Sequence, residues 1–334
     1  MAQRRLALPQ SRARENDEDP HERSSCVVSA SAVVFGYGDI GVRCTRVLLE
    51  HGVDVKLVVT HADDPAENRW YASLAEFATT SGLSVIAPAK PDDRLLDRLR
   101  IWKPDFLFSF YYRQLLPDWL LETARQGALN MHGSLLPRFR GRAPVNWAVL
   151  RGASETGATL HYMVSQPDAG DVVDQLAVPI RENDTAYEVF LRVADAAEAV
   201  LARSLPLLIA GTAPRTPQDL SQGEYCGRRR PEDGRIDWSR PAREIHNLVR
   251  AVAPPFPGAF ATFGDQRWMV TRTQVLGPGA RIVAPLTLHA EGELCVVTCI
   301  DANRLALLAA ADARGAIDLT ALQARLDQSP LAVS

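Results

Sequence analysis

The chain has 334 residues, of which 46% are hydrophobic and 23% charged, and its formal net charge is −3 at pH 7. This composition excludes a disordered or membrane-embedded chain, and the charge offers no field for a polyanionic partner such as nucleic acid. Because no apolar run is long enough to span a bilayer and the five scattered cysteines form no CxxC pair, we expect a cytoplasmic protein without membrane contact, disulfides or a bound metal.

The N-terminal half of the chain alternates short apolar segments with helical ones. Residues 1–30 mix charged residues, Ser and Pro without apolar periodicity, which predicts a disordered tail. The pattern then predicts strands at 32–35, 53–60, 84–86, 106–110, 128–132 and 159–164, and helices at 42–51, 74–80, 93–102 and 186–208. This alternation is typical of a Rossmann-like α/β domain over residues 31–210, with a parallel sheet and helices on both faces.

The C-terminal part has a different organisation. Residues 211–223, rich in Pro, Thr, Ser and Gln, are typical of a linker. Residues 224–334 combine a helical segment at 242–253 with short β-like segments such as 268–271 and 294–300. We therefore expect a smaller, OB-like β-barrel domain.

A glycine motif follows the first predicted strand. Gly36, Gly38 and Gly41 fit GxGxxG before a helix, and Asp63 lies at about the distance of a ribose contact. This context is compatible with an NAD or FAD site, as in a nicotinamide-dependent oxidoreductase. The other interpretation is a tight strand-to-helix turn that needs small residues.

The most informative residues end the strand predicted at 128–132. Strand side chains alternate in direction, so Asn130 and His132 point to the same side at the edge where open α/β sheets bind ligands. An amide N–H can stabilise an oxyanion and an imidazole can accept a proton from an amine, a combination suited to acyl transfer. Asp168, in a later turn, can orient the imidazole, although it also suits the turn itself. His161 is a weaker candidate, with a satisfied core histidine as the alternative.

Several segments in this order carry a family resemblance. Asn130 and His132 with residues 134–137, 140–144 and 168–170 resemble the 10-formyltetrahydrofolate-dependent formyltransferases, over about residues 32–300. The resemblance implies that Asn130, His132 and Asp168 are catalytic and that 10-formyltetrahydrofolate is the formyl donor. It also implies that the glycine motif does not bind a nicotinamide cofactor.

Within this family, residues 60–65, 109–113, 140–147 and 226–229 are most similar to the enzymes that act on UDP-4-amino-4-deoxy-L-arabinose. The resemblance implies a stand-alone formyltransferase, without the decarboxylase domain that some relatives carry. Its acceptor is then the 4-amino group of a nucleotide-linked aminosugar, as in lipid A modification. The partners that we expect are therefore two small molecules, the nucleotide sugar and the folate.

Two further sets of residues are expected to bind these molecules. In the family the backbone that follows the strand predicted here at 106–110 holds the pterin ring. The corresponding residues are Tyr111, Tyr112, Arg113, Gln114, Leu115 and Leu116. The alternative interpretation of these residues is an aromatic core. The candidates for binding the nucleotide sugar are Ser134, Arg140 and Arg142. The two arginines are candidates because guanidinium groups bind phosphate oxygens in a fork. The alternative interpretation is a solvated loop. Residues 228–230, three arginines, are interpreted as a solvated turn.

The alternative within the family is a methionyl-tRNA formyltransferase. Relatives that act on tRNA carry a basic insertion after the second strand, whereas residues 61–68 here are short and acidic. This segment favours the aminosugar. A non-enzymatic nucleic-acid binder built on the C-terminal barrel is disfavoured because no stripe of basic and aromatic residues is present.

Overall fold

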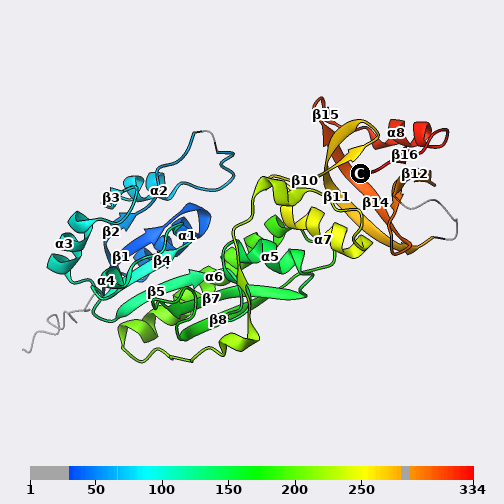
Figure 1. Cartoon of the computed structure of the whole chain (residues 1–334). Coiled ribbons are helices and arrows are strands. Elements are labelled where there is room, and N and C mark those ends of the chain that lie inside the picture. Colours follow the sequence, from blue (N-terminus) through cyan, green and yellow to red (C-terminus); the bar gives the residue numbers. More distant parts are fainter. Residues whose placement is uncertain (1–29, 66, 280–285) are drawn as a thin grey trace, which may run out of the picture.

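The computed structural model describes residues 30–65, 67–279 and 286–334. Apart from residue 30, the tail predicted for residues 1–30 lies outside the described residues. Figure 1 shows two lobes, a larger one built on a sheet with helices on both sides and a smaller one that holds the C-terminus.

The larger lobe contains a sheet with the strand order β3-β2-β1-β4-β5-β7-β8. In chain order the strands are β1 (Ser31–Gly36), β2 (Asp54–Val59), β3 (Val85–Ile86), β4 (Phe106–Phe110), β5 (Gly127–His132), β7 (Glu155–Tyr162) and β8 (Val172–Pro179). Strands β1 to β5 pair in parallel, whereas β7 runs antiparallel to both β5 and β8. The predicted Rossmann-like α/β class is confirmed, but the sheet is mixed. A short loop without a helix joins β7 to β8, and such a connection makes neighbours antiparallel.

Helices cover both faces of this sheet. They are α1 (Gly38–Glu50), α2 (Leu74–Thr80), α3 (Asp93–Trp102), α4 (Asp118–Leu121), α5 (Pro144–Leu150) and α6 (Ala186–Ile209). Side chains of β1 alternate between two apolar clusters, since Ala32 and Val34 pack with α1 and α6, whereas Val33 and Phe35 pack with α3 and α4. The strand β4 is buried along its whole length, as expected for the middle of a two-sided sheet.

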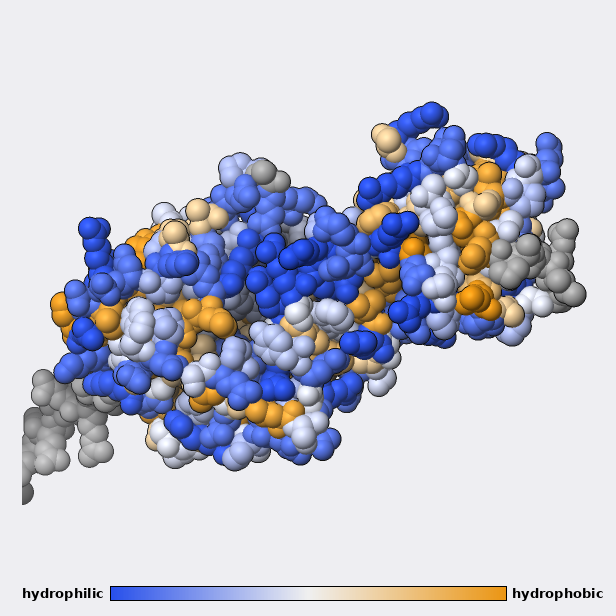
Figure 2. Space-filling model, in the orientation of Figure 1, coloured by the Kyte–Doolittle hydropathy of each residue, from blue (hydrophilic) through white to orange (hydrophobic). Residues whose placement is uncertain are grey.

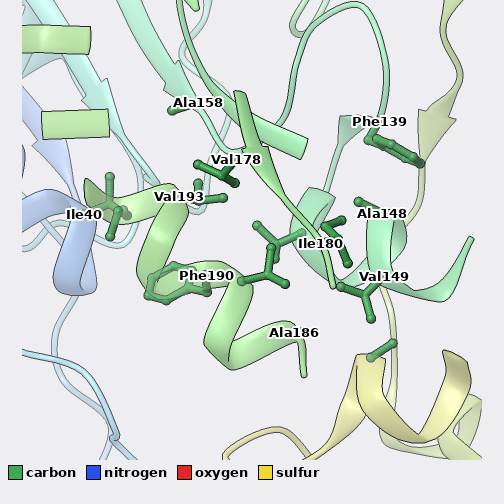
Figure 3. Close-up of a cluster of buried hydrophobic side chains, with 14 of the residues drawn as sticks. Ile40, Phe139, Ala148, Val149, Ala158, Val178, Ile180, Ala186, Phe190 and Val193 are labelled. Carbon is green, nitrogen blue, oxygen red and sulfur yellow. The ribbon is translucent and has the colours of Figure 1, made fainter. Parts of the chain in front are cut away.

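The long helix α6 closes one face of the larger lobe. It begins at a capping box, in which the Thr185 side chain accepts from the Glu188 N–H and the Glu188 carboxylate accepts from Thr185 in return. Figure 3 shows Phe190 and Val193 of this helix gathered with Val178 and neighbouring apolar side chains. The observed bounds differ by one residue from the helix predicted at 186–208.

The smaller lobe contains a sheet with the order β10-β11-β14-β13-β12-β16. Its elements are β10 (Ala259–Phe263), β11 (Gln266–Pro278), β12 (Thr287–Glu291), β13 (Leu294–Thr298), β14 (Asn303–Asp312), β15 (Gly315–Ala316), α8 (Leu319–Leu326) and β16 (Leu331–Ala332). A bridge between Phe263 and Val333 joins the two edges, so the sheet is nearly closed. The expected barrel-like C-terminal fold is confirmed.

The segment between the lobes first runs along the surface of the larger lobe. Thr216 forms a bridge with Val172, and η1 (Leu220–Gln222) follows. The strand β9 (Tyr225–Cys226) then pairs with β6 (Arg140–Gly141), the short strand after β5. After η2 (Pro231–Gly234), the helix α7 (Ala242–Val252) packs on both α5 and β11 and thus joins the lobes. The residues expected to form a linker therefore pair with β8 at Thr216, and their last residue, Gly223, lies against the carbonyl of Pro137 in the loop that follows β5.

Candidate active site

The carboxyl end of β5 opens into a cavity of about 490 Å³. Asn130 and His132 line it from β5, and His161 and Asp168 line it from β7 and the loop that follows. The strands β4 and β5 run in parallel, so their carboxyl ends share the edge where open α/β sheets bind ligands. The structure thus brings the three residues singled out in the sequence into one cavity, together with His161.

The tautomer of His132 follows from its contacts. The side chain is buried, and its Nε2 lies 2.9 Å from the carbonyl oxygen of Phe139. A carbonyl only accepts, so Nε2 carries the hydrogen of the neutral imidazole and Nδ1 keeps the lone pair. Nδ1 lies 3.6 Å from Asp168 Oδ1. The nitrogen that is free to take a proton therefore faces a carboxylate.

The Asp168 loop is held from two sides. Asp168 Oδ2 accepts the backbone N–H of Gly141 in β6 at 2.8 Å. The side-chain amide of Gln218 donates to the carbonyl oxygens of Asp168 (3.1 Å) and Gly170 (2.6 Å). Asp168 has a φ of +55°, and a Cβ on Gly170 would collide with the carbonyl of Tyr162. Strained backbone of this kind persists where surrounding contacts hold it, as at functional sites.

His161 has the opposite tautomer to His132. Its Nδ1 lies 2.8 Å from the carbonyl oxygen of Tyr162, so Nδ1 carries the hydrogen. Nε2 then accepts from Asn130 Nδ2 at 3.1 Å. Burial lowers the pKa of His161 to about 4, which keeps the ring neutral near pH 7. The contact fixes the Asn130 amide, whose Nδ2 also lies 3.5 Å from Asp168 Oδ1.

Residues 111–116, expected to bind the pterin, line the same cavity. Tyr111 has a φ of +58°, and its hydroxyl occupies the space that a side chain at residue 133 would need, which explains Gly133. The hydroxyls of Tyr111 and Tyr112 are buried without a hydrogen-bond partner. Among the described residues, the backbone N–H groups of residues 114–116 also make no hydrogen bond. Buried polar groups are normally paired, so the two hydroxyls suit a ligand with its own donors and acceptors, and the N–H groups of residues 114–116, in a half-exposed to exposed segment, are open to the same ligand.

A second cavity of about 540 Å³ lies next to the first and is rich in arginine. Its lining includes Arg113, Arg142, Arg228, Arg229 and Arg230, and Arg113 and Arg142 also line the first cavity. Within the described part of the chain, the guanidinium groups of Arg142 and Arg228 have no hydrogen-bond or ion-pair partner. Figure 2 shows a dense hydrophilic patch between the two lobes. Arg228 and Arg230, interpreted from the sequence as part of a solvated turn, are exposed, and the pairing of β6 with β9 brings their segment close to Arg142.

Ser134 and Arg140 lie outside the linings of both cavities. Ser134 is fully buried, and its hydroxyl donates to the carbonyl oxygen of Arg138 at 2.6 Å. Arg140 is also buried, with its Nε unpaired, and its backbone N–H donates to Glu224. Their contacts stabilise the loop after β5, and of the three expected nucleotide-sugar residues only Arg142 reaches a cavity.

The glycine motif has a packing explanation. A Cβ on Gly36 would lie 2.7 Å from Leu74 Cδ2, and one on Gly41 would lie 3.0 Å from the same atom. Gly38 has a φ of +59° and lies against the ring of Tyr71. Asp63, the expected ribose contact, instead accepts from Arg69 and Ser73. These contacts support the tight-turn interpretation.

Among the residues that the structure describes, no three His, Cys, Asp or Glu side chains are arranged as metal ligands. None of the helices in residues 30–65, 67–279 and 286–334 is long and apolar enough to cross a membrane.

Family models match most of the chain. The model described as formyl transferase matches residues 32–205, and the model of the formyl transferase C-terminal domain matches residues 229–319. The first match alone spans more than half of the chain and contains the cavity lining contributed by β4, β5 and the Asp168 loop.

Solved structures share this fold. The N-formyltransferase from Helicobacter canadensis, solved with folinic acid and dTDP-3-aminofucose, has a TM-score of 0.66 and 19% identity, covering 83% of this chain and 98% of that one. The sugar 3N-formyl transferase WlaRD, solved with dTDP and 5-N-formyl-THF, has a TM-score of 0.65 and 18% identity, covering 86% and 98%. A 4-N formyltransferase from Francisella tularensis has a TM-score of 0.56 and 20% identity, covering 69% and 91%.

Proposed function

This chain belongs to the formyl transferase family, as the sequence predicts, and we propose that it transfers the formyl group of 10-formyltetrahydrofolate to the amine of a nucleotide-linked aminosugar. One observation carries the proposal. Asp168 Oδ1 lies 3.5 Å from Asn130 Nδ2, 3.6 Å from His132 Nδ1 and 3.7 Å from His161 Nε2, in the wall of the cavity that residues 114–116 also line.

His132 is the general base of the proposed reaction. The amine nitrogen of the acceptor forms a bond to the formyl carbon, and the carbonyl π electrons move onto oxygen. His132 Nδ1 takes the proton that the amine loses, and the resulting imidazolium is stabilised by Asp168. As the bond between the formyl carbon and N10 breaks, the same proton passes to N10. The products are the formamide and tetrahydrofolate, and His132 returns to its neutral form.

Asn130 stabilises the negative charge that develops on the formyl oxygen. One N–H of its amide donates to His161, and the other points toward Asp168 over a distance of 3.5 Å, which is too long for a strong hydrogen bond. This second N–H is therefore available to a stronger acceptor. A donor fixed before the reaction stabilises an oxyanion without reorganisation.

The formyl donor fits the residues that line the first cavity. Its volume of about 490 Å³ lies within the usual range for small-molecule sites. The unpaired backbone N–H groups of residues 114–116 and the unpaired hydroxyls of Tyr111 and Tyr112 complement a ring with several donors and acceptors. The folates in the Helicobacter canadensis and WlaRD structures support a folate donor.

The arginine-rich cavity supports a diphosphate on the acceptor. Arg142 and Arg228 are free of carboxylates among the described residues, and guanidinium groups bind phosphate oxygens in a fork. This cavity shares Arg113 and Arg142 with the first, so a diphosphate there would place its sugar toward His132. The resemblance of residues 140–147 to the UDP-4-amino-4-deoxy-L-arabinose enzymes makes that aminosugar the preferred acceptor, and Asn130, His132, Asp168 and residues 111–116 remain the proposed site.

The test is a panel of UDP-, dTDP- and GDP-linked aminosugars with 10-formyltetrahydrofolate, followed by the release of tetrahydrofolate. Transfer to an aminosugar nucleotide, fastest with UDP-4-amino-4-deoxy-L-arabinose, is the expected result. Charged initiator methionyl-tRNA is assayed under identical conditions with the same donor. Faster transfer to the tRNA than to every aminosugar nucleotide would overturn the proposal.

A further inference from the structure

A cluster of ring side chains fills the crevice beside the glycine motif. The His61 and Tyr112 rings are stacked, with centroids 4.4 Å apart and an interplanar angle of 17°. Tyr37 contacts His61 and Tyr71 edge-on, at 5.5 and 5.4 Å, and the hydroxyls of Tyr37 and Tyr71 lie 3.0 Å apart. These residues follow β1, β2 and β4, three neighbouring strands. The crevice in which doubly wound folds bind dinucleotides is therefore occupied by side chains of the chain itself.

His61 is joined to the backbone at the end of β4. Its Nε2 accepts the backbone N–H of Arg113 at 3.1 Å, so this nitrogen carries no hydrogen. Among the described residues, His61 is the one side chain that hydrogen-bonds the main chain of residues 111–116. The Arg113 side chain is also held, since its guanidinium donates to Glu67 at 2.8 Å and lies 4.1 Å from the centre of the Tyr37 ring.

We propose that His61 is a positioning residue for the formyl donor. It fixes the backbone at Arg113, and residues 114–116, which follow directly, present the unpaired N–H groups to the first cavity. The inference rests on the proposed function, because it takes these groups as the binding surface for the folate. The cluster beside the glycine motif then has a role of its own, which is to preorganise the neighbouring donor site.

The charge state of His61 decides whether this contact exists. Burial, and to a smaller extent the charge of Arg113, lowers the pKa of His61, so the ring is neutral near pH 7. The titratable and charged groups that face it or its partners in the cluster are Tyr37, Glu67, Tyr71, Tyr112 and Arg113. Protonation below the ordinary histidine range would set an N–H against the Arg113 N–H, next to a guanidinium group. Affinity for the donor should therefore fall in acid.

The experiment compares His61→Ala with His61→Gln in the full chain. The Gln side chain reaches about as far as Nε2 and offers an acceptor that does not titrate. His51→Ala, which removes an exposed histidine at the end of α1, is the matched control. The dissociation constant for 5-formyltetrahydrofolate and the KM values for 10-formyltetrahydrofolate and the nucleotide sugar are measured at pH 7.5 and 5.5, with circular dichroism to verify folding.

We expect His61→Ala to weaken folate binding about 3- to 10-fold at pH 7.5, the effect of one hydrogen bond, and to leave the KM for the nucleotide sugar within about twofold. The dissociation constant of His61→Gln for the folate should stay within about threefold of the wild-type value at pH 7.5. Because Gln does not titrate, folate binding by this variant should weaken less than that of the wild type between pH 7.5 and 5.5. Unchanged folate binding in a folded His61→Ala, or equal increases in both KM values, would overturn the inference while the proposed function stands. If the Ala variant does not fold, an undiminished acid weakening in His61→Gln overturns it. Absence of folate binding by the wild type would overturn both.

Discussion

Replacing Asp168 by Asn removes the charge that faces His132 and keeps the size of the side chain. Asp168 Oδ1 lies 3.6 Å from His132 Nδ1, and the two side chains are only 15% and 7% exposed. With an effective dielectric constant of about 20, opposite charges at this distance attract by about 4 to 5 kcal/mol, and residual solvent screening reduces this to about 3 kcal/mol. Because the imidazolium exists only after proton transfer, the loss falls on the transition state, and kcat should drop about 10²- to 10³-fold.

The assay is tetrahydrofolate release with both substrates saturating. The amide oxygen introduced by Asp168→Asn can still accept the Gly141 N–H, so the loop should keep its conformation. Asp171→Asn removes the same charge from the same loop, away from the cavity lining, and should leave kcat within about twofold. A folded Asp168→Asn enzyme with kcat within threefold of the wild type would refute the electrostatic reasoning.

Four further predictions concern neighbouring side chains. His132→Ala should lower kcat by about 10²- to 10⁴-fold, the usual range for an acid–base group, and a folded variant with near wild-type turnover would exclude this role. Asn130→Ala should lower kcat by about 10²- to 10³-fold, whereas an effect on KM alone would make Asn130 a binding residue. Arg142→Ala should raise the KM for the nucleotide sugar about 10- to 100-fold and spare the folate, with Arg138→Ala, in the same loop but outside both linings, as control. For His161 the folded pKa of about 4 lies below the ordinary value, so the unfolded chain binds more protons and stability falls as the pH drops from about 6.5 to 4. In urea titrations the free energy of unfolding should therefore fall between pH 7 and 5 by about 2 kcal/mol less in His161→Gln than in the wild type. An equal fall in both proteins would contradict the buried neutral state of His161.

The elements that the sequence predicts best are those whose pattern is local. The helix predicted at 186–208 has an N-cap, a capping box and a long apolar stripe, and it is observed as α6. The helix α5 escaped prediction because no capping side chain marks its start, which follows Ala143 in the left-handed region. The reversed direction of β7, which is antiparallel to both β5 and β8, depends on how the chain returns after β5, a tertiary property that alternation of strands and helices does not encode.

In the candidate site too, the sequence predicts the features that have a local pattern and misses those that depend on tertiary structure. The alternation of strand side chains predicts that Asn130 and His132 point to one side, and the turn residues predict the place of Asp168. The groups that set their chemistry are mostly backbone carbonyls, such as that of Phe139, which no motif specifies. Gln218 holds the Asp168 loop from a segment 50 residues away, and its polar, Pro-rich surroundings indicated only a linker. The importance of His161 depends on the register of β5 with β7, which sets it opposite Asn130, and no local pattern encodes that register.

The place of the cavity follows from how the switch point of the sheet is filled. In the order β3-β2-β1-β4-β5 the strands are added toward one edge up to β3 and toward the other edge from β4 on, so the strand order reverses between β1 and β4, and a ligand of a doubly wound fold would normally bind there. Here Leu74 closes over the glycines and Tyr37 and Tyr71 cover the start of α1, so the β1 side of the crevice has no room for a pyrophosphate. The β4 side stays open, and residues 111–116 leave it with unpaired backbone groups toward β5. The glycines that look like a nucleotide fingerprint thus allow the close packing that leaves the open edge at β4 and β5, where Asn130 and His132 lie.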